Sequence, residues 1–217
     1  MRTFLTLAAC LTAFPAVAQD RPTVLPTRDV SVAYRANSPG GTAEMRISWL
    51  VARGMMRVDM PGGMLGWLLV DLNGKTGVMV MEAQRMVMDL PAGQIPPGAA
   101  GGSPNARYTR EAGARVANLD CTNWRVEDQG ETARVCLTAE GVMLRAENLS
   151  GPPQSRGVLE ATAVTFGAQD PARFQRPTGD QSFQMPGGLP PGMAPGMAPG
   201  MPRGTALPPP GMAGPGR

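Results

Sequence analysis

The chain has 217 residues and is nearly balanced in charge, with 20 Lys and Arg against 17 Asp and Glu. This balance argues against nucleic acid or a strongly anionic membrane as a partner. The sequence contains no His, which excludes Ser-His-Asp and Cys-His catalysis as well as His-ligated zinc. No Gly-rich phosphate loop joins a predicted strand to a helix. We therefore expect a protein that is not an enzyme and has no cofactor.

The N-terminus has the pattern of a secretory signal peptide. Arg2 precedes an apolar run over residues 4–14, and Ala16-Val17-Ala18 provides a small-x-small cleavage site. The run is too short for a permanent membrane helix, which needs about 20 apolar residues. Residues 7–10 resemble a lipobox that would lipidate Cys10, but cleavage there would leave an apolar run shorter than such signals use. The sequence therefore predicts cleavage after Ala18 and a periplasmic or secreted protein.

Composition divides the remaining chain into a folded part and a tail. Residues 178–217 include 10 Pro and 10 Gly, a content typical of disordered segments, which bury too little apolar surface to offset the entropy of ordering. Residues 19–177 have the size of one domain. Within it, the Pro- and Gly-rich residues 91–106 are too long for a simple turn and predict a flexible insertion.

Short strands are the dominant pattern in residues 19–177. Apolar residues alternate with polar ones over residues 30–35 and 44–51, the period of a half-buried strand. Asn73-Gly74 predicts a hairpin turn, and Glu140-Gly141 a similar one. Because connections this short require antiparallel neighbours, we expect a mainly β fold with one antiparallel sheet. Further predicted strands cover residues 55–60, 67–72, 77–81, 85–90, 123–127, 133–138, 142–147 and 158–166.

Helix signals are few. Asp170-Pro171 places an N-cap residue before a Pro that suits the first helical position, and Pro177 ends the helix within two turns. A second possible turn covers residues 110–115. We expect one or two short helices.

Two cysteines remain after the predicted cleavage, Cys121 and Cys136. They flank a predicted hairpin with its tip near residues 128–130. A two-residue loop at Asp128 and Gln129 would place the cysteines opposite one another, and a three-residue loop would shift the register by one. Either register permits a disulfide. A redox or metal pair is the alternative, but the spacing is not Cys-x-x-Cys and no His accompanies it.

The middle strands are apolar on both faces, because residues 67–70, 78–81 and 86–88 lack alternating polar positions. Either the short helix and the insertion cover the second face, or a ligand does. Met-rich apolar surfaces adapt to irregular partners, so a concave sheet of this kind could hold an acyl chain or another apolar ligand. The candidate ligand-binding residues are Trp49, Trp67, Met79, Met81, Met86 and Met88.

The tail repeats Pro-Gly-Met-Ala and places Met193, Met197 and Met201 at four-residue spacing. Thioethers are soft ligands for Cu(I), so these residues are candidate metal ligands. A simple low-complexity repeat explains the same pattern.

Several segments resemble an exported bacterial family. They are Cys-Thr-Asn-Trp at residues 121–124, Val-Cys-Leu-Thr-Ala-Glu-Gly at 135–141 and Gln-Asp-Pro-Ala-Arg-Phe at 169–174. Upstream, residues 55–59, 69–71 and 85–88 fit the same pattern. This chain resembles domain-of-unknown-function family 4412, which is similar to lipoprotein-carrier-like (LolA-like) periplasmic half-barrels. The resemblance implies a curved antiparallel sheet, partly closed by a helix or loop, that encloses an apolar cavity.

Three functional hypotheses follow. The first is an exported non-enzymatic envelope protein that binds an apolar or amphiphilic ligand, such as a lipid, on a Met-rich concave sheet. The second is a structural or protein-interaction module with a protein partner in the envelope. The third is Cu(I) binding by the tail.

Overall fold

The computed structural model describes residues 21–60, 66–91, 94–95, 101–152, 156–178 and 181–183, the last three by their backbone. The predicted signal peptide lies outside the described residues, as do residues 92–93 and 96–100 of the predicted insertion and most of the predicted tail. The candidate copper ligands Met193, Met197 and Met201 lie outside them as well.

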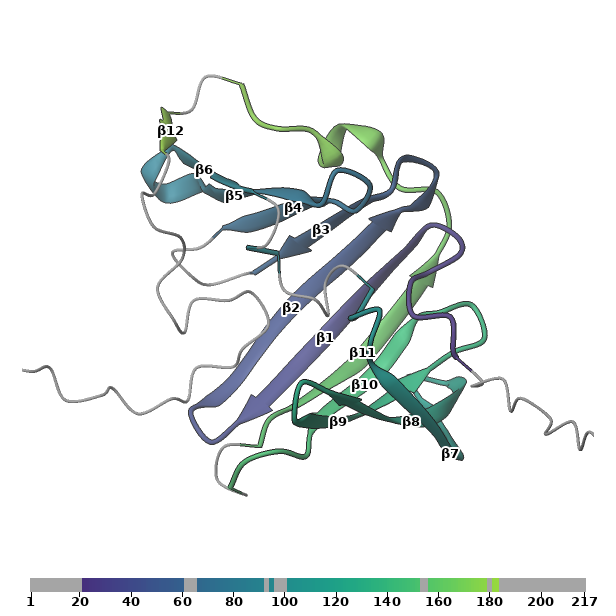
Figure 1. Ribbon diagram of the computed structural model, residues 1–217. Coiled ribbons are helices and arrows are strands. Elements are labelled where there is room, and N and C mark those ends of the chain that lie inside the picture. The colour runs from purple at the N-terminus through teal and green to yellow at the C-terminus, as the bar shows by residue number, and fades with distance from the viewer. Residues whose placement is uncertain are drawn as a thin grey trace, which may run out of the picture.

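The described residues form one open sheet of 12 strands with three short 3₁₀ helices (Figure 1). This confirms the predicted mainly β class with a single curved antiparallel sheet. The strands are β1 (Val30–Ser38), β2 (Gly41–Leu50), β3 (Met55–Asp59), β4 (Trp67–Asp71), β5 (Thr76–Met81), β6 (Met86–Leu90), β7 (Arg107–Val116), β8 (Leu119–Asp128), β9 (Glu131–Leu137), β10 (Met143–Asn148), β11 (Val158–Phe166) and β12 (Gln181–Phe183). The helices are η1 (Val51–Arg53), η2 (Glu82–Gln84) and η4 (Pro171–Phe174).

The order across the sheet is β12-β6-β5-β4-β3-β2-β1-β11-β10-β9-β8-β7. The two halves are meanders, joined where β1 pairs with β11. In Figure 1, β1 and β2 run diagonally through the middle, with β3–β6 on one side and β7–β10 on the other. Strand β12 pairs with β6 in parallel, beyond Pro177, where the sequence predicted the domain to end.

The sheet curves toward one face. Strands β7 and β11 are in contact although three strands separate them in the sheet. One continuous apolar cluster includes Met88 on β6 and Cys121 on β8, near opposite ends of the strand order. We call the face that carries this cluster the concave face. The opposite face of β2–β6 carries a second cluster, with Leu50, Trp67 and Leu69 among its members, and we call it the convex face.

One prediction about a turn and one about a helix were wrong in detail. The hairpin at Asn73-Gly74 exists, but its loop has four residues and positive φ falls on Lys75. The Asp71 carboxylate accepts hydrogen bonds from the backbone N–H groups of Asn73 and Gly74, which stabilises this longer loop. Residues 110–115, predicted as a possible helical turn, belong to strand β7, because pairing with β8 prevails over local helix propensity.

The predicted disulfide is confirmed, with 5.4 Å between the Cα atoms of Cys121 and Cys136. Its register differs from both that were predicted. The hairpin loop consists of Gln129 and Gly130, both with positive φ, as in the turns that match strand twist. Cys136 therefore pairs with Asn123, and the bridge joins diagonal neighbours.

The predicted short helix is η4. The Asp170 carboxylate accepts a hydrogen bond from the Ala172 N–H, and Pro171 occupies the first helical position. The chain from Asp170 to Arg176 crosses the convex face, and we call it the strap. Its Phe174 is buried in the convex cluster. The strap therefore covers part of the second apolar face that the sequence predicted to need covering.

Candidate functional site

The concave face brings together most of the predicted ligand-binding residues. Trp49, Met79 and Met88 belong to its buried cluster. Met81 lies two residues after Met79, and Met86 two residues before Met88, so strand alternation places both on the same face. Met81 and Met86 pair with each other across β5 and β6 and are only half-buried. Five of the six predicted residues thus share one face.

Trp67 lies on the convex face instead. Its indole N–H donates to a carboxylate oxygen of Glu82 at 2.9 Å, and the Arg57 guanidinium lies 3.9 Å from the centroid of its ring. Both contacts come from the chain itself. The structure therefore separates Trp67 from the other predicted ligand-binding residues.

An ion-pair network holds the strap against the convex face. The Asp59 carboxylate accepts from Arg57 at 2.7 Å and from Arg173 at 2.7 Å. Arg57 also donates to the backbone oxygen of Arg173 at 2.8 Å. Arg176 forms a further ion pair with Asp89 on β6. These contacts close the convex face around Phe174 without a ligand.

Methionines mark one end of the concave face. Tyr34 pairs with Met45, and Arg46 pairs with Asp59, so Met45 on β2 lies beside Met60 after β3. Met45, Met60, Met81 and Met86 are all half-buried and occupy the same end of the sheet from β2 to β6, a width of roughly 20 Å at normal strand spacing. We call these four residues the methionine rim.

The sequence analysis identified Met81 and Met86 but missed Met45 and Met60. Met45 alternates with polar neighbours and Met60 ends the predicted strand over residues 55–60, but neither lies in the apolar middle strands that supplied the methionine candidates. The place of Met60 follows from a hydrogen bond of 3.1 Å from its backbone N–H to the oxygen of Gly66.

The other end of the concave face contains a buried polar group without a partner. Trp49 is 8% exposed, and its indole N–H has no hydrogen-bond acceptor within the part of the chain that the structure describes. Trp49 pairs with Val30 and Met56, and Val30 pairs in turn with Phe166. Its neighbours along this row are therefore apolar, and none of their side chains offers an oxygen.

The buried hydroxyl of Tyr34 on the same face is satisfied. It donates to the backbone oxygen of Met143 at 2.6 Å, and burial raises the pKa of the phenol well above its ordinary value. Tyr34 thus ties β1 to β10 across β11 and holds the curvature of the sheet.

Part of the concave face is covered by the segment that joins β6 to β7. Ile95 is buried in the concave cluster and lies so close to Gly77 that a Cβ at that position would meet its Cδ1 at 2.7 Å. At the other end of this segment, Arg21 donates hydrogen bonds to the backbone oxygens of Ser103 and Pro104. The chain therefore contributes its own cover on this side as well.

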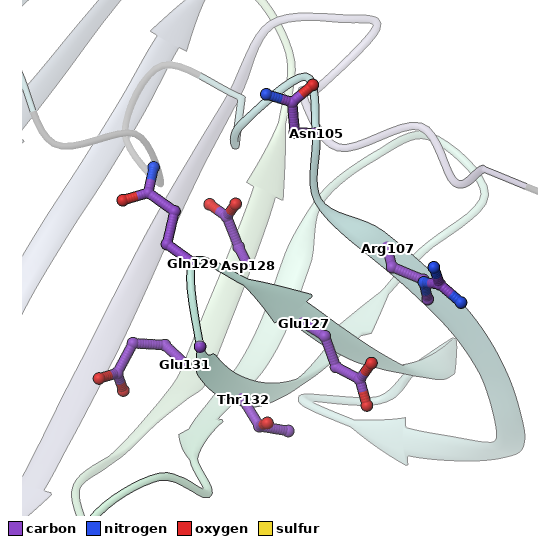
Figure 2. Close-up of a pocket in the computed structure, with 8 residues that line it drawn as sticks. Asn105, Arg107, Glu127, Asp128, Gln129, Glu131 and Thr132 are labelled. Atoms are coloured by element: carbon purple, nitrogen blue, oxygen red, sulfur yellow. The ribbon is translucent and has the colours of Figure 1, made fainter.

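A polar surface pocket lies at the tip of the β8–β9 hairpin (Figure 2). Its lining includes Arg107, Glu127, Asp128 and Glu131. Figure 2 shows the carboxylates of Glu127 and Glu131 pointing away from one another. Within the described residues, no group of three or more His, Cys, Asp or Glu side chains is arranged to hold a metal ion. This pocket has neither the apolar lining nor the convergent ligands of the predicted sites.

None of the helices in the described ranges is both long and apolar enough to cross a membrane.

No family model matches the chain, and neither does any curated protein, so membership of family 4412 stays a prediction. The fold is similar to solved structures. An uncharacterized conserved protein from Thermus thermophilus aligns with a TM-score of 0.55 at 14% identity, over 73% of this chain and 91% of that one. MucB aligns with a TM-score of 0.53 at 15% identity, over 74% of this chain and 61% of MucB. The Pseudomonas aeruginosa MucA/MucB complex aligns with a TM-score of 0.51 at 14% identity, over 77% of this chain and 63% of that one. At such identities the likeness shows a common fold alone, and the chain spans less than two thirds of the MucB chains.

Proposed function

We propose that this chain is an exported binding module of the cell envelope that holds an apolar or amphiphilic ligand on its concave face. The methionine rim is the observation that carries the proposal. Met45 and Met60 pack against the buried apolar cluster, Met81 and Met86 pair with each other at the same end of the sheet, and all four are half-buried. Flexible thioether side chains adapt to ligands of varied shape.

The convex face does not compete for this role, because Phe174 and the strap already cover its apolar residues. The disulfide supports a location outside the cytosol, since such bonds persist in oxidising compartments. Together with the predicted signal peptide, it supports a periplasmic or secreted protein. The residues proposed to contact the ligand are Trp49, Met79, Met81, Met86 and Met88, together with Met45 and Met60.

Native mass spectrometry of protein purified from the periplasm, followed by lipid extraction, tests this proposal. We expect a co-purified amphiphile, or binding of added dodecanoate by the emptied protein. The double variant M81D/M86D places two charges on the rim and should abolish binding. A matched control is R125A, which changes an exposed side chain on β8, away from the concave cluster. A wild-type protein that carries no lipid and binds no dodecanoate would refute the proposal.

A protein partner is the second candidate, and one observation favours it. MucB, which shares the fold, is found in a complex with MucA. Crosslinking in cells should then recover a discrete partner of this chain. Deletion of residues 178–217 tests whether the tail contributes, because a partner held by the tail is lost and one held by the sheet is retained.

A further inference from the structure

The indole of Trp49 differs from the other buried polar side chains of the sheet. Ser31 and Ser48 share a hydrogen bond of 3.0 Å, and the Thr138 hydroxyl accepts from the Val142 N–H. Trp67 donates to Glu82. Among the buried side-chain nitrogen and oxygen atoms of the described residues, Nε1 of Trp49 is the one that has no hydrogen-bond partner. Buried polar groups in native proteins nearly always have one, so a partner outside the protein is expected.

The surroundings of Trp49 restrict what that partner can be. It lies in the concave cluster, against which half-buried Val51, Leu72 and Phe166 also pack, at the end of the sheet opposite the methionine rim. Four residues along β2 separate Trp49 from Met45, about 13 Å at the rise of a strand. An acceptor that reaches Trp49 must therefore belong to a molecule whose remaining surface is apolar, or be a single water.

The Arg28 guanidinium lies at this end together with the carboxylates of Glu140 and Asp29. The Arg28 guanidinium lies 3.8 Å from the centroid of the Phe166 ring, and Phe166 is one strand beyond Val30 in the row that contains Trp49. Arg28 remains about half exposed, and its ion pair with Glu140 has a long separation of 3.4 Å. A cation at the edge of an apolar surface attracts a carboxylate or phosphate head group.

We propose that the Trp49 indole N–H donates a hydrogen bond to a head-group oxygen of an anionic amphiphile whose apolar chain extends toward the methionine rim. This deepens the proposed function and rests on it. Trp49 is thereby the residue that fixes the orientation of the ligand, and the methionines adapt to its chain.

Titration of the full chain with dodecanoate tests the role of Trp49. The variant W49F keeps an aromatic ring and removes the donor, so its affinity for dodecanoate should fall about tenfold, the usual effect of losing a hydrogen bond to a charged group. The matched control W67F removes the indole that donates to Glu82 on the convex face and should bind as the wild type does. Affinity for 1-decanol should fall less in W49F, because its hydroxyl is an uncharged acceptor.

NMR provides a readout that does not depend on the stability of W49F. The chain has three Trp, so the indole resonance of Trp49 can be assigned by elimination from W67F and W124F. Dodecanoate should shift this resonance downfield and leave that of Trp67 in place. An unmoved Trp49 resonance, as a resident water would give, overturns the proposal, and so does equal affinity of W49F and wild type. Absence of any binding to the wild type would refute the proposed function itself.

Discussion

Replacing Phe174 with Ala removes the side chain that closes the apolar part of the convex face. Phe174 is 4% exposed and packs in one cluster with Leu50, Trp67, Leu69, Val80 and Val87. Truncation of a buried Phe to Ala costs about 3 to 5 kcal/mol. We expect the lower end, about 3 kcal/mol, because the strap lies at the surface and can settle into part of the vacated space. For a domain of this size the Tm should fall by roughly 6 to 12 °C.

Urea denaturation followed by circular dichroism measures this loss. R176A is the control, because Arg176 lies on the same strap and its ion pair with Asp89 is largely exposed to solvent, so it should cost less than about 1 kcal/mol. The variant D59N weakens the contacts of Asp59 to both Arg57 and Arg173. Its loss of unfolding free energy should lie between those of R176A and F174A. A free energy of unfolding for F174A within about 0.5 kcal/mol of wild type would contradict the assignment of the strap as a structural cover.

Three further predictions concern the concave face. The double variant C121A/C136A should lose about 3 kcal/mol, as expected for a closed loop of this length; unchanged stability in urea under non-reducing conditions would be inconsistent with a structural bridge. Burial raises the pKa of Tyr34, so the folded state retains the phenol proton when the unfolded state has lost it. Stability should therefore be constant below about pH 10, the ordinary pKa of Tyr, and fall above it; Y34F should show a weaker alkaline decline, and identical pH profiles would refute this role. In ligand-free protein, W49F should cost less than about 1 kcal/mol, because the smaller ring loses packing but the unpaired N–H is removed as well; a loss above about 3 kcal/mol would indicate that Trp49 is simply a core residue.

Local patterns in the sequence were sufficient for most of the sheet. Alternation predicted β1 and β2, and the Asp170-Pro171 signal predicted η4 with its N-cap. Both depend on residues that are neighbours in the chain, where steric and hydrogen-bonding preferences act directly. The apolar character of both faces of β4–β6 also predicted correctly that something must cover the second face.

Features that depend on pairing between distant residues were harder to predict. The segment of β7 contains Arg, Glu and Ala, which favour helices, yet a whole strand partner in β8 outweighs them. The loop at Gln129-Gly130 shifted the cysteine register, because Gln129 adopts a positive φ that its residue type does not suggest. Met60 could not be assigned to the rim, since its neighbour there is Met45, fifteen residues earlier in the chain.

The two faces of the sheet show why sequence patterns alone could not locate the candidate site. Trp49 and Trp67 are both buried, both lie on strands, and both have apolar neighbours in sequence. The structure distinguishes the two tryptophans by the groups that contact their indole rings. Glu82 and Arg57 satisfy Trp67 on a face that Phe174 already closes. Among the described residues Trp49 has no acceptor, and its face ends in half-buried methionines. A ligand on the convex face would have to displace the strap and break the ion pairs of Asp59. A ligand on the concave face would have to displace the cover that Ile95 provides, but it would supply a missing hydrogen bond. The proposed ligand therefore belongs to the concave face, and substitutions at Asp59 should alter stability without altering affinity for an amphiphile.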